Sequence, residues 1–111
     1  MTKALRIGLL SDTHGWLNPK IVKHFANVDQ IWHAGDIGSL EVIEELEEIA
    51  PVKAVYGNVD DFDVRRTFPE ILEFTEHNVK VLMIHIGGYP GHYSPNIKER
   101  LYEVKPKLFI C

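Results

Sequence analysis

The sequence predicts an α/β fold built on a parallel sheet that helices cover. Leu5, Ile7, Leu9 and Leu10 give a nearly continuous apolar run, which is typical of a strand buried on both faces. Two further apolar runs each follow a segment with helical spacing, so the order is strand, helix, strand, helix, strand. Such alternation predicts parallel strands joined by right-handed crossovers, with all strand ends at one edge of the sheet.

Length and composition indicate one globular domain over residues 1–111. The chain has 45% hydrophobic and 25% charged residues, and its net charge of −4 argues against a stable nucleic-acid partner. No apolar run approaches membrane-spanning length, so we expect a cytoplasmic protein without a membrane partner. Cys111 is the single cysteine, which excludes an intrachain disulfide.

The first half of the chain supplies the parallel unit. Asn18 caps a helix that starts at Pro19 and is expected to continue to Asn27. A short strand over Gln30 to His33 follows, and Ser39 caps a second helix. The inner face of that second helix is an apolar stripe of Val42, Ile43, Leu46, Ile49 and Ala50, and its glutamates form a solvated face. Pro51 ends it, and Val52 to Tyr56 forms the third strand.

The second half predicts a hairpin, a helix and a last strand. Residues 61–70 are irregular and charged, so we expect a surface loop in which Arg65 and Arg66 face solvent or substrate. The runs 71–75 and 79–85 flank a short polar break and form an antiparallel hairpin. A loop rich in glycine and proline leads to a helix from Ser94-Pro95 to Val104, and residues 108–111 form the last strand.

Metal-competent side chains follow four of the predicted strands. Asp12 and His14 follow the first strand, Asp36 the second and Asn58 the third, while His85 ends the second hairpin strand. Carboxylate, imidazole and amide ligands together suit Mn²⁺, Fe, Zn²⁺ or Mg²⁺. We expect two ions bridged by a carboxylate such as Asp36, with a bridging water as nucleophile in phosphoryl displacement.

Several of these residues also have ordinary structural interpretations. Ser-Asp-Thr after a strand is a common turn or cap, so Asp12 and His14 alone are a weak signal. Alternation along its strand turns His33 away from the ligand side, which favours a core or supporting role. Trp16 could line a substrate groove, but core packing is the preferred interpretation for both Trp16 and Trp32.

Four motifs in order, SDTHG, HAGD, GNVD and the strand-terminal His85, resemble those of the calcineurin-like metallophosphoesterase superfamily, in particular its small prokaryotic phosphodiesterases. The resemblance covers nearly the whole chain. It implies a four-layer αββα sandwich that hydrolyses phosphodiesters at a dinuclear centre. Asp12 and His14 would bind the first metal, Asp36 would bridge, and Asn58 and His85 would bind the second, with Mn²⁺ the first choice and Ni²⁺ among the alternatives.

Two features depart from the family pattern. Many members place a histidine after the motif asparagine to protonate the leaving group, whereas this chain has Val59 and then Asp60, so Asp60 is the candidate general acid. The family's late Gly-His-x-His segment should begin where the sequence stops at Cys111, so we expect a truncated fold that lacks its C-terminal strands. The activity could then be impaired, and an inactive protein-interaction scaffold of the same fold is the alternative function.

The family resemblance and the truncated second sheet also predict a substrate class and an oligomeric state. The expected substrate is a small phosphodiester. The last strand would leave apolar sheet surface uncovered, which predicts a homo-oligomer, most simply a symmetric dimer. Its interface is expected to include residues 79–85 and 108–111.

Overall fold

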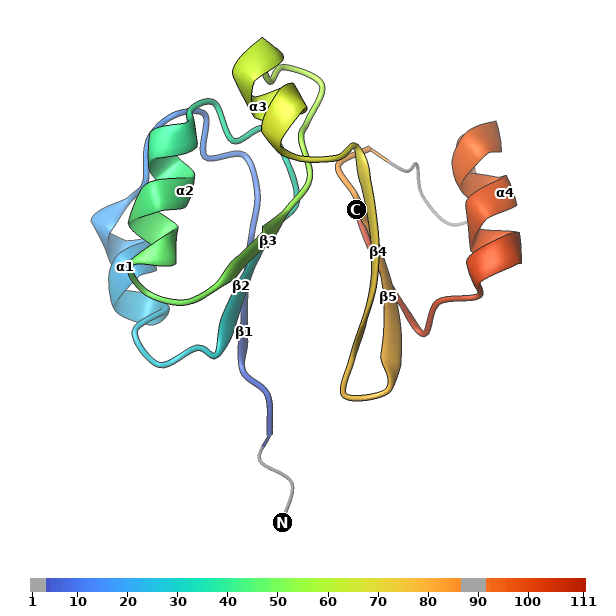
Figure 1. Ribbon diagram of the computed structural model, residues 1–111, viewed down its shortest axis with the longest axis horizontal. Coiled ribbons are helices and arrows are strands. Elements are labelled where there is room, and N and C mark those ends of the chain that lie inside the picture. Colours follow the sequence, from blue (N-terminus) through green and yellow to red (C-terminus); the bar gives the residue numbers. More distant parts are fainter. Residues whose placement is uncertain (1–3, 87–91) are drawn as a thin grey trace.

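A computed structural model describes residues 4–86 and 92–111 of the chain. It contains two three-stranded sheets, ordered β1-β2-β3 and β4-β5-β6. The sheets stand side by side, with α1 and α2 on the outer face of the first sheet and α4 on the outer face of the second (Figure 1). The predicted four-layer αββα arrangement is confirmed.

The first sheet is the predicted parallel unit. It consists of β1 (Ile7–Leu10), β2 (Gln30–His33) and β3 (Val52–Ala54), with β2 paired in parallel to both neighbours. Its helices are α1 (Pro19–His24) and α2 (Leu40–Glu47), capped by Asn18 and Ser39 as expected. Helix α1 ends sooner than predicted, because Phe25 already leaves the helical conformation as its C-cap.

The second sheet combines the predicted hairpin with a crossover strand. Strands β4 (Ile71–Glu76) and β5 (Val79–Ile84) pair antiparallel, and β6 (Leu108–Ile110) joins β5 in parallel after α4 (Pro95–Val104). The turn residues His77 and Asn78 both have positive φ, at 46° and 67°, as a two-residue hairpin turn of the favoured handedness requires. The hairpin prediction is therefore confirmed.

Part of the predicted loop over residues 61–70 is a helix, so that prediction was wrong. Helix α3 (Phe62–Thr67) is capped by the side chain of Asp61, which accepts a hydrogen bond from the Val64 amide. Val64 is its only buried residue, and a single apolar position gives no helical period to detect in the sequence.

The two cores lie on either side of the first sheet. One packs that sheet against its helices, with Ile31, Ile37 and Leu46 fully buried. The other fills the space between the sheets around Trp32, which contacts Phe74 edge to face at 4.9 Å between ring centroids. Both sheets are thus fixed to each other by apolar packing.

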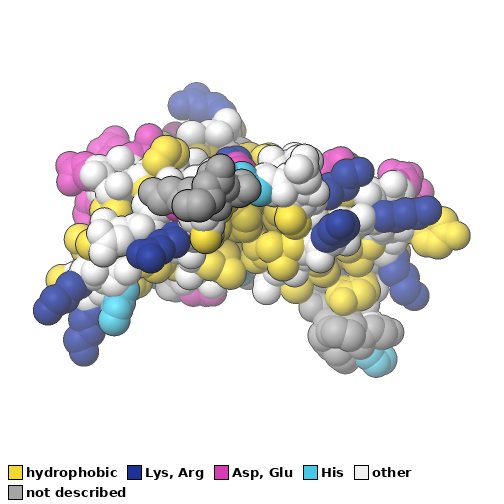
Figure 2. All heavy atoms as spheres, turned by 90° about the horizontal axis from the view of Figure 1, so that it is seen from below, with side chains coloured by type: hydrophobic (Ala, Val, Ile, Leu, Met, Phe, Trp, Pro, Cys, Tyr) yellow, Lys and Arg dark blue, Asp and Glu magenta, His cyan; other side chains and the backbone are white. Residues whose placement is uncertain are grey.

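Strand β5 is the central strand of its sheet. Within the single chain, residues 81–84 are buried, whereas Val79 on β5 and Leu108 on β6 are exposed, and the expected dimer stays a prediction. Hydrophobic side chains gather in the middle of the face at the lower end of the molecule (Figure 2).

No helix among the described residues has the length and apolar character needed to cross a bilayer.

Candidate metal centre

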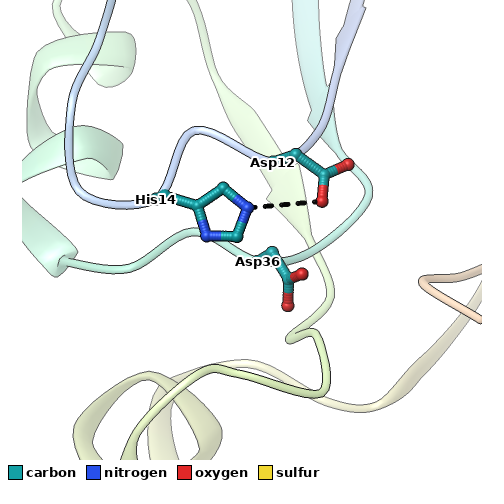
Figure 3. A group of neighbouring side chains, drawn as sticks. All are labelled: Asp12, His14 and Asp36. Atoms are coloured by element: carbon teal, nitrogen blue, oxygen red, sulfur yellow. Dashed lines mark ion pairs between the residues drawn. The ribbon is translucent and has the colours of Figure 1, made fainter.

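The predicted ligands lie in loops at the carboxyl ends of the strands. Asp12 and His14 follow β1, Asp36 follows β2, Asn58 follows β3, and His85 comes directly after β5. The first three come together as predicted, because one ligand atom from each lies within 4.8 Å of the others (Figure 3). His14 Nε2 is 3.6 Å from Asp12 Oδ1.

These three residues share an uncommon backbone conformation. Asp12, His14 and Asp36 have φ values of 59°, 50° and 56°, and they are half of the six described non-glycine residues with positive φ. Side chains other than glycine seldom adopt this region, and such strained residues concentrate at functional sites. The positive φ values of these three residues cost conformational energy, and in return they orient the three side chains toward one another.

Backbone hydrogen bonds hold the two ligand loops side by side. The amides of Asp12, His14 and Gly15 donate to the carbonyls of Gly35, Asp36 and Ile37 at 2.8–3.0 Å. This pairing continues the β1–β2 contact beyond the strands themselves. The separation of the two loops is therefore fixed by the main chain.

Two glycines allow the loops to approach each other. A Cβ at Gly35 would lie 2.6 Å from the Cβ of His85, and a Cβ at Gly57 would overlap the Asp36 carboxylate. Real Cβ atoms do not tolerate such contacts. Only glycine at these two positions lets His85 and Asp36 reach the centre of the site.

His85 joins the cluster from the second sheet. Its Nδ1 lies 2.8 Å from the carbonyl oxygen of Ala34, which can only accept, so Nδ1 carries the proton. In the neutral ring, Nε2 then faces Asp36 Oδ2 at 3.0 Å as a second acceptor, with Asp12 Oδ1 at 3.9 Å. Two acceptors facing each other need a proton or a cation between them, and this donor set fits a divalent metal.

Asp36 is the most enclosed ligand. Its side chain is 7% exposed, against 52% for Asp12 and 55% for His14. Its Oδ1 accepts a hydrogen bond from the Val59 amide at 3.1 Å, while Oδ2 faces His85. Asp36 therefore contacts both the first-sheet cluster and the second-sheet histidine.

The charge on Asp12 is stabilised locally. The hydroxyl of Ser11 donates to Asp12 Oδ2 at 2.7 Å, and this bond is the main reason that the pKa of Asp12 lies below its ordinary value. The nearby His85 and His14 lower that pKa further, while partial burial opposes the shift. Asp12 is thus ionised and ready to bind a cation over the neutral range.

His33 has the supporting role that strand alternation predicted. It is fully buried, its Nδ1 accepts from the Gly35 amide at 3.1 Å, and its Nε2 lies 3.0 Å from Thr13 Oγ1. Because Thr13 donates to the Ile37 carbonyl at 2.9 Å, Nε2 must donate to Thr13. Burial lowers the pKa of His33 to about 4, so the ring that joins the two ligand loops is neutral.

Asp60, the candidate general acid, is held by backbone amides. It is only 4% exposed and accepts three backbone hydrogen bonds, from Ile37, Gly38 and Gly57, at 2.7–3.1 Å. Both carboxylate oxygens of Asp60 are therefore taken up by these amide donors: Oδ1 accepts from Gly38, and Oδ2 accepts from Ile37 and Gly57. The geometry therefore favours a structural role, in which Asp60 joins the loop after β3 to the loop after β2.

Asn58 lines a pocket of about 260 Å³ together with His85, as a second-metal ligand would. The sequence did not predict that Tyr56 and Glu70 line this pocket, because neither belongs to a motif. Arg65, which also lines it, was expected to face solvent or substrate.

The two tryptophans differ in burial. Trp16 is 65% exposed, so the core position predicted for it was wrong, whereas Trp32 is buried as expected.

Comparison with known proteins decides the family. The sequence profile of the Calcineurin-like phosphoesterase superfamily domain matches residues 5–111. This chain belongs to the calcineurin-like phosphoesterase superfamily. It is 38% identical to "Probable metallophosphoesterase MJ0623" of Methanocaldococcus jannaschii, over 71% of this chain and 42% of that protein.

Two further likenesses agree with that assignment. The chain is 31% identical to "Phosphodiesterase MJ0936" of the same organism, over 90% of this chain and 69% of that protein. The crystal structure of Vps29 from Chaetomium thermophilum superposes with a TM-score of 0.73 at 14% identity, covering 96% of this chain and 59% of Vps29. This superfamily member thus has the fold of small archaeal phosphodiesterases, and its match to the first relative covers less than half of that protein's length.

Proposed function

We propose that this chain forms the metal-binding part of a phosphodiesterase that uses two divalent ions, with Mn²⁺ the first candidate. The observation that carries the proposal is the approach of His85 Nε2 to Asp36 Oδ2 at 3.0 Å, beside the Asp12, His14 and Asp36 cluster. Ligands from both sheets thus meet at one point. The match to the superfamily over residues 5–111 supports the same chemistry.

In this proposal the ligands divide between two ions. Asp12 and His14 hold the first, Asn58 and His85 the second, and the buried Asp36 carboxylate holds both. Bound ions would supply Lewis acidity and an activated water for attack on the phosphorus. The substrate would be a small phosphodiester whose phosphate contacts the Asn58 amide.

The chain's own residues prepare this site. The Ala34 carbonyl fixes the His85 tautomer that leaves Nε2 available. Asp60 positions the loops through its amide contacts and, in our proposal, donates no proton to the leaving group. The neutral His33 holds Thr13, and therefore the loop between Asp12 and His14, against the strand β2.

Calorimetry with Mn²⁺ and turnover of bis(p-nitrophenyl) phosphate test the proposal together. The wild-type protein should bind Mn²⁺ and hydrolyse the diester only with metal present. Asp36→Asn should weaken Mn²⁺ binding by at least about a hundredfold, because an amide lacks the charge that holds two cations together. Glu76→Gln, an isosteric change at the other end of the sandwich, is the control and should leave binding unchanged.

An interaction scaffold of the same fold is the competing function. A scaffold would need the layers of the sandwich but not the approach of His85 to Asp36 or the positive φ of the three ligands. Absence of both Mn²⁺ binding and metal-dependent hydrolysis in the wild-type protein would overturn the enzyme proposal in favour of the scaffold.

A further inference from the structure

The pocket beside the metal centre extends away from the ligands. Asn58 and His85 line it, and its remaining walls come from the loop after β3, helix α3 and the ends of the hairpin. These walls carry one cation, one carboxylate, one phenol and two aliphatic side chains, namely Arg65, Glu70, Tyr56, Ile84 and Ile86. A substrate whose phosphate reaches Asn58 would place its remaining atoms against these groups.

Arg65 is held in position from within the chain. Its Nε donates to the Asp60 carbonyl at 2.7 Å, and its Nη2 donates to the Asn58 carbonyl at 3.0 Å. The guanidinium also lies over the ring of Tyr56, 4.9 Å from the centroid. A guanidinium has five N–H donors, so these two bonds orient the group and leave donors to recognise an anion at little cost in side-chain entropy.

Glu70 does not neutralise this cation directly in the described contacts. Its Oε2 accepts a hydrogen bond from the Tyr56 hydroxyl at 3.2 Å. Tyr56 thus stands between the carboxylate and the guanidinium, with its hydroxyl bonded to one and its ring beneath the other.

The neighbouring Arg66 also lies over an aromatic ring, but it makes no hydrogen bond to the loop that carries Asn58 and Asp60 among the described contacts. It lies over the ring of Phe62 at 5.4 Å and pairs with Asp63 at 4.0 Å, and its side chain is 70% exposed. Arg66 is not among the residues that line the pocket. The two adjacent arginines therefore offer a matched pair in which one side chain faces the pocket and the other does not.

We propose that Arg65, supported by Tyr56, binds a second anionic group of the substrate beyond the scissile phosphate. The proposal rests on the phosphodiesterase function proposed above and adds a substrate class to it. Diesters that carry a further phosphate on one arm are preferred over diesters with uncharged arms. Arg65 contacts the substrate in this scheme, and Tyr56 is a positioning residue.

Ligand binding tests the preference without turnover. Thymidine 5′-monophosphate and thymidine 3′,5′-bisphosphate differ by one phosphate, and the nucleoside serves only as a spacer. Calorimetry with Mn²⁺ present, and an NMR titration in EDTA, should show tighter binding of the bisphosphate by at least about tenfold, as a charge-assisted contact to arginine provides. Arg65→Ala should reduce that preference to less than about twofold, whereas Arg66→Ala should preserve it.

Kinetics with a second matched pair separate this contact from one to the scissile phosphate. The p-nitrophenyl ester of thymidine 5′-phosphate is compared with the same ester carrying a 3′-phosphate. The 3′-phosphate should lower KM and leave kcat unchanged in the wild-type protein, and Arg65→Ala should abolish the KM difference. Arg65→Gln provides a second variant of similar volume, and circular dichroism checks that both variants are folded.

The outcomes separate the two proposals. If neither ester is turned over with Mn²⁺ but the bisphosphate is still preferred through Arg65, the phosphodiesterase function fails and the anion site stands. Equal affinity for the two nucleotides in the wild-type protein overturns the anion site. A preference that survives both Arg65 variants, or a loss of rate that is equal for both esters, overturns it as well.

Discussion

Charged side chains join the sheets at both ends of the sandwich, but they have a lysine partner at only one of the two ends. At the lower end, Lys53 Nζ lies 2.7 Å from Glu76 Oε1 and 2.9 Å from Gln30 Oε1, and Gln30 also accepts from the Trp32 indole at 3.1 Å. Every member has an opposite charge or a hydrogen-bond partner. This end is complete without any ligand.

At the upper end, acidic oxygens and imidazole nitrogens face one another. Asp12, Asp36, His14 and His85 approach within a few ångströms, and no lysine or arginine forms a described ion pair with any of them. One sandwich thus pairs its charges with lysine at one end and, in our proposal, keeps carboxylates and imidazoles for a cation at the other. The first two predictions concern the residues that keep the upper end folded despite this arrangement.

Asp60→Ala should produce the largest loss of stability. The substitution leaves three backbone amides without their acceptor, two of them in fully or nearly buried positions, and we expect a loss of about 3–5 kcal/mol in the free energy of unfolding. Urea denaturation in EDTA measures it. A loss below about 1 kcal/mol would contradict the structural role of Asp60.

His33 should make stability depend on pH. Its pKa is lowered to about 4 in the folded chain from 6.5 in the unfolded chain, so the unfolded state takes up the proton first. Stability is fully present above pH 6.5 and falls as the pH drops toward 4, by up to about 3 kcal/mol. Denaturation at several pH values should show this loss in the wild-type protein and a flatter dependence in His33→Gln.

Lys53→Met tests the network of Lys53, Glu76 and Gln30 at the lower end of the sandwich. Removing the ammonium leaves the partly buried Glu76 carboxylate without its cation, and we expect a loss of about 1–3 kcal/mol with no change in Mn²⁺ affinity. Arg66→Ala, which breaks an ion pair between side chains about 70% exposed, is the control and should cost less than about 0.5 kcal/mol. Similar losses in the two variants would remove the distinction between the paired network and an ordinary surface pair.

Asp36→Asn should have the smallest effect on the metal-free protein. The amide oxygen can still accept from Val59, and the amide nitrogen can donate to the unprotonated Nε2 of His85. We expect the free energy of unfolding in EDTA to change by less than about 1 kcal/mol, in contrast to the large loss of metal affinity. A stability loss as large as that of Asp60→Ala would show that Asp36 supports the fold itself.

The sequence predicted the layered architecture and the grouping of Asp12, His14 and Asp36. Apolar periodicity and alternating elements predict the parallel sheet, and parallel crossovers then bring Asp12 and Asp36 to one edge. Side-chain alternation along β2 correctly predicted that His33 supports the ligand loops and does not join the ligand cluster. These predictions succeed because they depend on local pattern and on the handedness of connections.

Other features carry no comparable signal. The partners of Asp60 are backbone amides, which every residue except proline has, so the sequence could not distinguish a buried anchor from a general acid. Helix α3 has one buried residue and no apolar period. The exposure of Trp16 and the contact of Arg65 with Tyr56 depend on how loops pack, which composition does not determine.

The meeting of His85 with Asp36 also has a consequence for the order of folding. The first sheet and the hairpin can each form from nearby segments, but the ligand set exists only after the two sheets dock. High-affinity Mn²⁺ binding should therefore develop in the slowest refolding phase, together with burial of Trp32 between the sheets. Under the proposed function the ion would bind only the docked state, and it should then slow hydrogen exchange in both sheets at once.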